Sequence, residues 1–152
     1  MSLTDGFVDV GAGVVLRPSL TEAQFLSDAS SLAPKPYIHN GPHRSYRLPS
    51  ADVGGRTFVP VVFFSNGAIT MVTLSWVDPS RDPKSDAWAN WSEQRERAVA
   101  TEDAAWLAKA LSGSGSTAGA YAYRWGAISS GFDPKGGFSS VRVRYDSPRS
   151  AP

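Results

Sequence analysis

One ionisable residue, Asp103, falls among the apolar positions of a predicted long helix. At about 100° per residue it lies near the centre of an apolar stripe, flanked in projection by Val99, Trp106 and Ala110. A carboxylate that faces a sheet costs several kcal/mol if it stays unpaired. It can serve as a general acid or base with a raised pKa, or as a structural acceptor that locks the helix onto the last hairpin. No second carboxylate or histidine is placed beside it, so the sequence favours the structural role.

The segment DPKGG, Asp133 to Gly137, is the second place where chemistry is conceivable. Lys135 could approach an anionic ligand there, with backbone amides as additional donors. The same residues also suit a tight turn, because Pro134 presets φ, the glycines tolerate positive φ and the Asp133 side chain can cap the turn. The segment does not lead from a strand into a helix, and the turn is therefore favoured over a phosphate loop.

The two histidines, His39 and His43, are four residues apart, a spacing that could hold a metal on a helix. Asn40-Gly41-Pro42 lies between them and forbids a regular helix, so a polar loop is the better interpretation. The chain has no cysteine, and none of its serines stands in a G-x-S-x-G elbow. We therefore predict no metal, no cofactor and no catalytic residue.

Three arginines are predicted to share one face of a sheet. Arg142 and Arg144 alternate with apolar residues of the last strand, and Arg124 has the same parity on the strand before it. Such a row can protect a sheet from aggregation. It can equally form a docking surface for an acidic protein, since interfaces favour arginine and aromatic residues. The sequence does not decide between these two interpretations.

The strands that position these residues are indicated by alternation and by turn residues. Tyr121 to Tyr145 reads as two strands around a loop rich in Gly and Pro. Phe58 to Phe64 and Ala68 to Trp76 flank Asn66-Gly67, the pair that favours a type I′ hairpin turn. Weaker strands are expected at 7–16 and 45–48, while 33–44 and 49–55 read as loop or turn.

Two helices are expected, one short and one long. Ser19 with Glu22 matches a capping box for a helix of two to three turns, and Asn90 with Glu93 matches one for the long helix. The long helix should end at the Gly and Ser cluster, a flexible loop at about 112–119. We therefore predict a single α+β domain over 1–152, with an antiparallel sheet of about five to six strands, both helices on one face and a tail at about 147–152.

Composition limits the possible partners. Fifteen Lys and Arg against 14 Asp and Glu leave a formal charge of +1, which argues against a nucleic-acid binder. No apolar run approaches the roughly 20 residues of a membrane span, and the N-terminus lacks the basic and apolar regions of a signal sequence. We expect a cytoplasmic protein without membrane contact, although a mature secreted chain would look the same.

Several segments of the chain resemble a group of small bacterial α+β proteins that have no assigned activity. The resemblance covers most of the chain and is carried by LRPSLTEAQFL, WSEQRE, DAAWLAKAL and, most specifically, WGAISSGFDPKGGFSSVRVRY. It implies common descent but transfers no catalytic residue. The matching positions are candidates for fold maintenance as much as for function: Asp103, Trp106, Trp125, Gly126, Asp133, Pro134, Lys135 and Gly137. Small proteins of this type often resemble immunity or accessory proteins encoded beside toxins, which is an analogy of type.

Two functions follow as expectations. The first is a non-enzymatic bacterial protein of the immunity or inhibitor type that binds another protein, such as a toxin with an acidic surface, through Arg124, Lys135, Arg142 and Arg144. The second is a small-molecule-binding protein or an enzyme. Its pocket would lie between the long helix and the C-terminal hairpin and would use Asp103, Trp106, Trp125 and Asp133, with Lys135 nearby.

Overall fold

The computed structural model of the protein describes residues 2–77, 92–111, 120–135 and 137–146. Within them the fold is α+β, as predicted, and every strand pairing is antiparallel. The main sheet has eight strands rather than the five to six expected. These are β3 (Lys35–Asn40), β4 (His43–Arg47), β5 (Ala51–Val53), β6 (Arg56–Ser65), β7 (Ala68–Trp76), β8 (Ala120–Tyr123), β9 (Gly126–Asp133) and β10 (Phe138–Tyr145).

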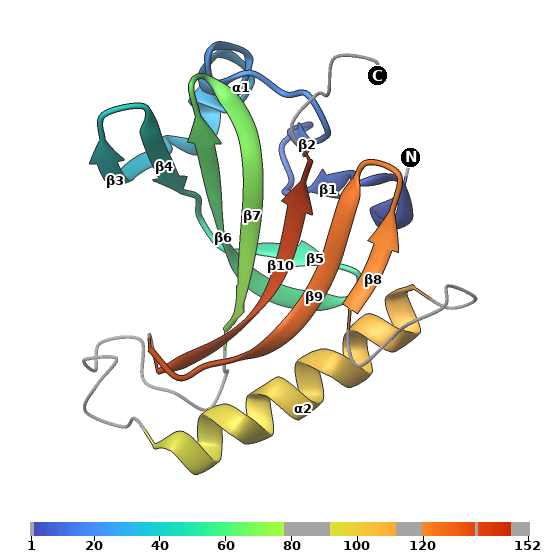
Figure 1. The fold of residues 1–152 in the computed structure, drawn as a ribbon. Helices are drawn as coiled ribbons and strands as arrows, with labels where there is room; N and C mark the ends of the chain where they lie inside the picture. The colour runs from blue at the N-terminus through green and yellow to red at the C-terminus, as the bar shows by residue number, and fades with distance from the viewer. Residues whose placement is uncertain (1, 78–91, 112–119, 136, 147–152) are drawn as a thin grey trace.

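The sheet is ordered β3-β4-β6-β7-β10-β9-β8, and β5 pairs with β6 beside that path. A small second sheet, β1 (Val8–Asp9) with β2 (Val15–Leu16), lies near the N-terminus. The main sheet curls strongly, and α2 (Glu93–Ala110) runs across one end of it, while α1 (Glu22–Asp28) lies at the other (Figure 1). Two short 3-10 helices, η1 (Leu3–Asp5) and η2 (Ser30–Leu32), complete the described elements.

The additional strands come from segments that carry weak strand signals. β3 has six exposed residues and includes Pro36, so it shows no alternation and was expected to be loop. The stretch from Tyr121 to Tyr145 contains three strands, because Arg124 and Trp125 form a two-residue turn between β8 and β9. That turn has neither Gly, Asn nor Pro at its two central positions, and the alternation continues through it. The sequence therefore could not mark it.

The central hairpin confirms the clearest strand prediction. β6 and β7 pair along their length around Asn66 and Gly67, which have φ values of 52° and 79°. Both lie in the left-handed region that a type I′ turn requires.

The helix starts differ from the predicted capping boxes. Thr21 caps α1, with its side chain accepting from the Gln24 amide while the Gln24 side chain accepts from the Thr21 amide. The expected Ser19 and Glu22 pair is wrong, because Ser19 adopts a φ of 66° and the Glu22 side chain turns to Arg44 and Tyr46. Ser92 caps α2 by accepting from the Arg95 amide. The predicted cap at Asn90, the loop at 112–119 and the tail at 147–152 lie outside the described residues.

The hydrophobic core lies on one face of the main sheet, which we call the inner face. Its fully buried strand residues alternate along each strand: Phe58 and Val62 on β6, Val72 and Leu74 on β7, Val141 and Val143 on β10, and Ile128 on β9. Phe25 of α1, Leu107 of α2, and Val8 and Leu16 of the small sheet are buried with them. Within the described residues, the helices and the small sheet therefore cover this same face.

The N-terminal segment is fastened to the last strands by two aromatic side chains. The Tyr145 hydroxyl donates to the Gly6 carbonyl at 2.7 Å, and burial raises its pKa far above the usual range. The Trp125 indole donates to the Thr4 carbonyl at 2.8 Å, and its ring stacks on Tyr123. These bonds join residues more than 120 positions apart and bring the start of the chain onto the inner face.

A substitution at Gly126, the first residue of β9, tests how closely β9 and β10 approach each other. A Cβ at this position would stand 1.9 Å from the Arg144 carbonyl oxygen, a backbone atom. We expect Gly126→Ala to lower the free energy of unfolding by about 1–3 kcal/mol or more, because the strands must separate. Urea denaturation followed by tryptophan fluorescence measures this. Gly131→Ala on the same strand is the matched control, since a Cβ there meets nothing within 4 Å. Equal effects of the two substitutions would contradict the packing argument.

Candidate functional site

Asp103 is fully buried, as the sequence predicted, and its partner is an arginine from the sheet. Its Oδ1 accepts a hydrogen bond of 2.6 Å from Nη1 of Arg56, the first residue of β6. The Arg56 side chain is only 13% exposed and lies over the Trp76 ring, 4.7 Å from its centroid. This ion pair joins α2 to the start of β6 and not to the C-terminal hairpin that the sequence suggested.

A second buried carboxylate, Glu96, lies on the same face of α2. Its Oε1 accepts from the Ser139 amide at 2.9 Å, and its backbone carbonyl accepts from the Ser139 hydroxyl. Glu96 is 6% exposed. It and Asp103 are seven residues apart, which is close to two helical turns, so both point at the sheet. Sequence reasoning missed Glu96, although this spacing from Asp103 was a usable signal.

Burial raises the pKa of the Asp103 carboxyl to about 6, and the charges of Glu96 and Glu102 contribute in the same direction. The Arg56 guanidinium opposes the shift by stabilising the carboxylate. The second oxygen of Asp103, Oδ2, has no hydrogen-bond partner within the described residues. A buried carboxylate oxygen without a hydrogen bond is poorly solvated, which raises the free energy of the charged form and so raises the pKa.

This pKa makes a prediction about stability with a definite sign. A carboxyl with a pKa raised in the folded state stabilises the fold below its unfolded pKa of 3.8, and that contribution is lost as the pH rises through about 6. The free energy of unfolding of the wild type, minus that of Asp103→Asn, should therefore fall by up to about 3 kcal/mol between pH 4 and pH 7. Urea denaturation of both proteins across this range measures the difference. A difference that rises with pH would instead mean that the Arg56 ion pair dominates.

The other predicted pocket residues do not gather around Asp103. The Trp106 indole donates to the Gly54 carbonyl at 3.0 Å and packs edge-on against Phe58. Trp125 packs on the N-terminal segment, and Asp133 accepts from the Lys135 amide at 2.9 Å inside the β9–β10 turn. No hydrogen bond or ion pair of the described residues joins Asp103 to Lys135 or to a histidine. Trp106, Trp125 and Asp133 thus form their contacts in three separate places.

The two histidines lie on the β3–β4 hairpin rather than in a loop. The His39 ring packs edge-on against Tyr46, with ring centroids 5.3 Å apart, and His43 Nδ1 lies 3.2 Å from the Ser65 hydroxyl. Their ring contacts are thus with Tyr46 and Ser65 and not with each other. In the part of the chain that the structure describes, no three His, Asp or Glu side chains gather in a way that could hold a metal ion.

Two cavities of useful size open on the described residues. One, of about 1160 Å³, lies between the N-terminal segment, the β5–β6 turn and the C-terminal end of α2, and Trp106 and Lys109 line it. The other, of about 680 Å³, lies beside β4 and is lined by Lys35 and Arg47. Neither Asp103 nor Lys135 lines either cavity.

The face of the main sheet opposite the core, which we call the outer face, carries cations in two neighbouring rows of paired residues. One row of paired residues crosses the sheet from β3 to β8: Lys35, Arg47, Val61, Thr73, Arg142, Ser129 and Ala120. The next row crosses from β4 to β8: Ser45, Phe63, Met71, Arg144, Ala127 and Ala122. Neither row contains an aspartate or a glutamate.

The centre of the outer face is apolar, and its cations stand on both sides of that centre. Val61, Phe63 and Met71 are half-buried, as is Val59 nearby on β6. Arg47 and Arg142 are three strands apart, about 14 Å at the usual strand spacing. The buried apolar side chains of α1 and α2, Phe25 and Leu107, belong to the core on the inner face. The result is an apolar strip with cations along two borders.

The predicted cationic residues fall on this face to different degrees. Arg142 and Arg144 occupy the rows themselves, and Arg124 lies in the exposed turn beyond Ala122. Lys135 lies apart from the three arginines. It follows the end of β9 and Arg124 precedes the start of β9, so the eight-residue strand separates the turns that contain them (Figure 1). The predicted set of four is therefore not one patch.

Lys35 and Arg47 belong to the outer face but were not among the predicted site residues. Only the tertiary pairing of β4 with β6 brings them into register with Arg142. A signal was present in the sequence, because no aspartate or glutamate occurs between Asp28 and Asp52. None of Lys35, Arg47, Arg124, Arg142 or Arg144 forms an ion pair with another described residue.

Comparison with known proteins adds no functional information. No family model, no curated protein and no solved structure matches the chain. Among the described residues, none of the helices is both long and apolar enough to cross a membrane.

Proposed function

We propose that the protein acts by binding the acidic surface of another protein with its outer face. The observation that carries the proposal is the pair of outer-face rows, in which an apolar centre is bordered by cations that form no ion pair with another described residue, and neither row contains an acidic residue. An apolar centre with a polar border is the usual anatomy of an interface, and arginine is enriched there. The function is thus one of contact and not of catalysis.

The positive charge of the outer face is not a property of the whole chain. The whole chain has a formal charge of only +1, so the acidic residues must be concentrated elsewhere. Glu22, Glu96 and Asp103 form their bonds on the inner side of the sheet, and none of the cations in the outer rows forms an ion pair with another described residue. Such an asymmetry steers an acidic partner toward one face and fixes its orientation. An inhibitor of the immunity type would use this face to cover a functional surface of a toxin.

Charge reversal on the outer face tests the proposal. Arg142→Glu with Arg144→Glu replaces two cations in adjacent rows. The wild-type protein, immobilised on a resin and incubated with lysate of the cells that produce it, should capture an acidic protein. The variant should bind that protein at least about tenfold more weakly, because like charges would face each other. Isothermal titration with the purified partner measures the loss.

Arg17→Glu with Lys109→Glu is the matched control, since it changes the net charge equally but lies outside the main sheet. The control should bind like the wild type, and circular dichroism should show that both variants are folded. Failure of the wild type to capture any specific partner would count against the proposal. An equal loss of affinity in the variant and in the control would mean that binding depends on the net charge of the protein and not on the outer face.

Binding of a small molecule is a second candidate, and the cavity of about 1160 Å³ favours it. The site differs from the predicted one, because Trp106 faces the β5–β6 turn and the N-terminal segment instead of the C-terminal hairpin. Its volume is slightly above the usual range of ligand pockets, which is about 300–1,000 Å³.

A fragment library screened by ¹H–¹⁵N NMR tests this second candidate. Bound fragments should shift the Trp106 indole and the amides of Gly54 and Gly55, whereas the Trp125 indole, whose bond is to Thr4, should not move. A screen in which no fragment shifts the Trp106 indole would remove this candidate.

A further inference from the structure

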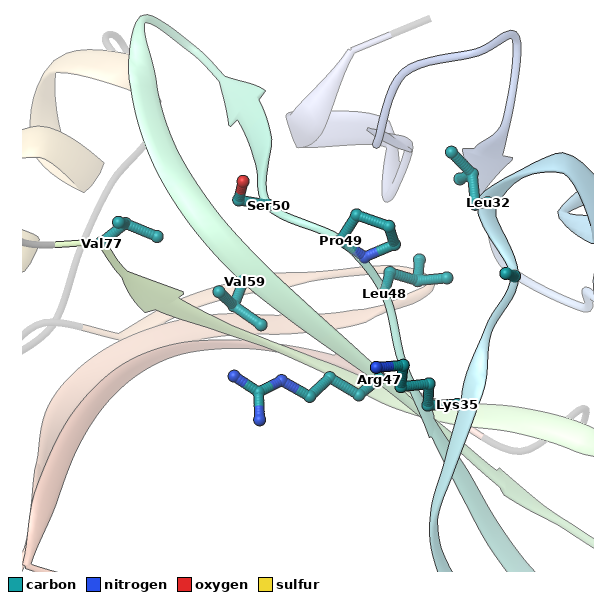
Figure 2. A pocket seen from close by; sticks show the side chains of 9 residues that line it. Leu32, Lys35, Arg47, Leu48, Pro49, Ser50, Val59 and Val77 are labelled. Carbon is teal, nitrogen blue, oxygen red and sulfur yellow. The ribbon is translucent and has the colours of Figure 1, made fainter. Parts of the chain in front are cut away.

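The cavity of about 680 Å³ beside β4 is a groove at one border of the outer face. Its apolar walls are Leu32, Leu48, Pro49, Val59 and Val77, and its charged residues are Lys35 and Arg47. Figure 2 shows the Arg47 side chain extended beside Val59, with Pro49 and Ser50 on the opposite wall. The groove therefore combines an apolar depression with cations at one side.

The two cations of the groove are held side by side by the sheet. Lys35 of β3 and Arg47 of β4 are direct partners in the antiparallel register, and both side chains are exposed. Directly opposed residues have Cβ atoms about 5 Å apart, and like charges at that distance repel each other. An anionic group that binds between them removes this repulsion, and the Arg47 guanidinium can bind a carboxylate through two parallel hydrogen bonds.

The groove is continuous with the outer face. Arg47 pairs with Val61, the next member of the first row, and Val59 lies two residues away on the same side of β6. A partner chain on the apolar centre can thus extend into the groove without leaving the sheet. Val77 is 37% exposed at its far side, so an apolar side chain of the partner would bury surface there.

A second copy of this chain is a poor occupant for this groove. The hairpin of β3 and β4 has no acidic residue and carries Lys35 and Arg47, which form no ion pair with another described residue, so two copies that met through it would bring like charges together. Pro36 and a register shift between Pro36 and His39 also interrupt the edge strand, which discourages strand pairing between copies. Charge complementarity instead favours an acidic chain.

We propose that this groove anchors a segment of the partner in which a glutamate or aspartate stands next to a leucine-like side chain. The carboxylate binds between Lys35 and Arg47, and the apolar side chain lies against Leu48, Val59 and Val77. This inference rests on the proposed function and adds to it the chemistry of the segment that is recognised.

Peptide titration of the full-length protein tests the inference. The probe is a short, end-capped peptide in which leucines are flanked by glutamates. It should shift the Arg47 Nε–H resonance and the amides of Lys35 and Val59 in ¹H–¹⁵N spectra. Lys35→Gln with Arg47→Gln should raise its dissociation constant at least about tenfold, because the carboxylate loses both charged donors. Lys135→Gln, which removes an exposed cation in the β9–β10 turn outside both outer-face rows, should change it less than about twofold.

Two peptide analogues separate the parts of the site. Replacing the glutamates by glutamines and, separately, the leucines by alanines should each weaken binding. No binding of the probe, shifts confined to another surface, or equal affinity for either analogue would overturn the groove assignment. So would a concentration-dependent dimer in sedimentation that dissociates on Arg47→Gln, because a second copy would then be the occupant. If the groove variant still binds the captured acidic partner while Arg142→Glu with Arg144→Glu does not, the groove inference fails and the proposed function stands.

Discussion

The attachment of α2 to the main sheet depends on two buried carboxylates. Asp103 binds Arg56 at the start of β6, and Glu96 binds Ser139 near the start of β10. β6 and β10 lie on either side of β7, so the two bonds tie one helix to strands on both sides of β7. An apolar helix face could slide or rotate on a curled sheet, whereas two directional bonds about two turns apart fix both its angle and its depth.

Burying the carboxylate of Asp103 has an electrostatic cost, and the two faces of the sheet differ in the charges that they carry. Burying Asp103 disfavours its charge and raises its pKa, even though Arg56 lies 2.6 Å away. The acidic residues used in this way point to the inner side of the sheet. The outer side keeps its arginines and Lys35 without acidic neighbours in the same rows. Within the described residues, the buried carboxylates Glu96 and Asp103 thus lie on the inner side, whereas the two outer rows contain cations and no acidic residue.

The sequence predicted those features that arise from local periodicity. The Asn66-Gly67 hairpin, the alternation of the last strand and the burial of Asp103 all follow from residues within a few positions of each other. The α+β class followed from the same patterns. The number of strands did not, because β3 is exposed along its whole length and contains Pro36, β5 has only three residues, and the turn at Arg124 and Trp125 interrupts no alternation. The cap of α1 was also misplaced, since Ser and Thr occur together before it and only the backbone decides which one caps.

The sequence by itself determined the charge, the absence of cysteine, and the parity that puts Arg142 and Arg144 on the face opposite Val141 and Val143. Parity is a local property of an extended chain, so one strand is enough to read it. The tertiary structure decided which strands are neighbours, and hence that Lys35 and Arg47 join those arginines across β6 and β7. It also decided that Asp103 meets Arg56, a residue 47 positions away. Both depend on strand order, which is fixed by packing over the whole core and leaves no local mark in the chain.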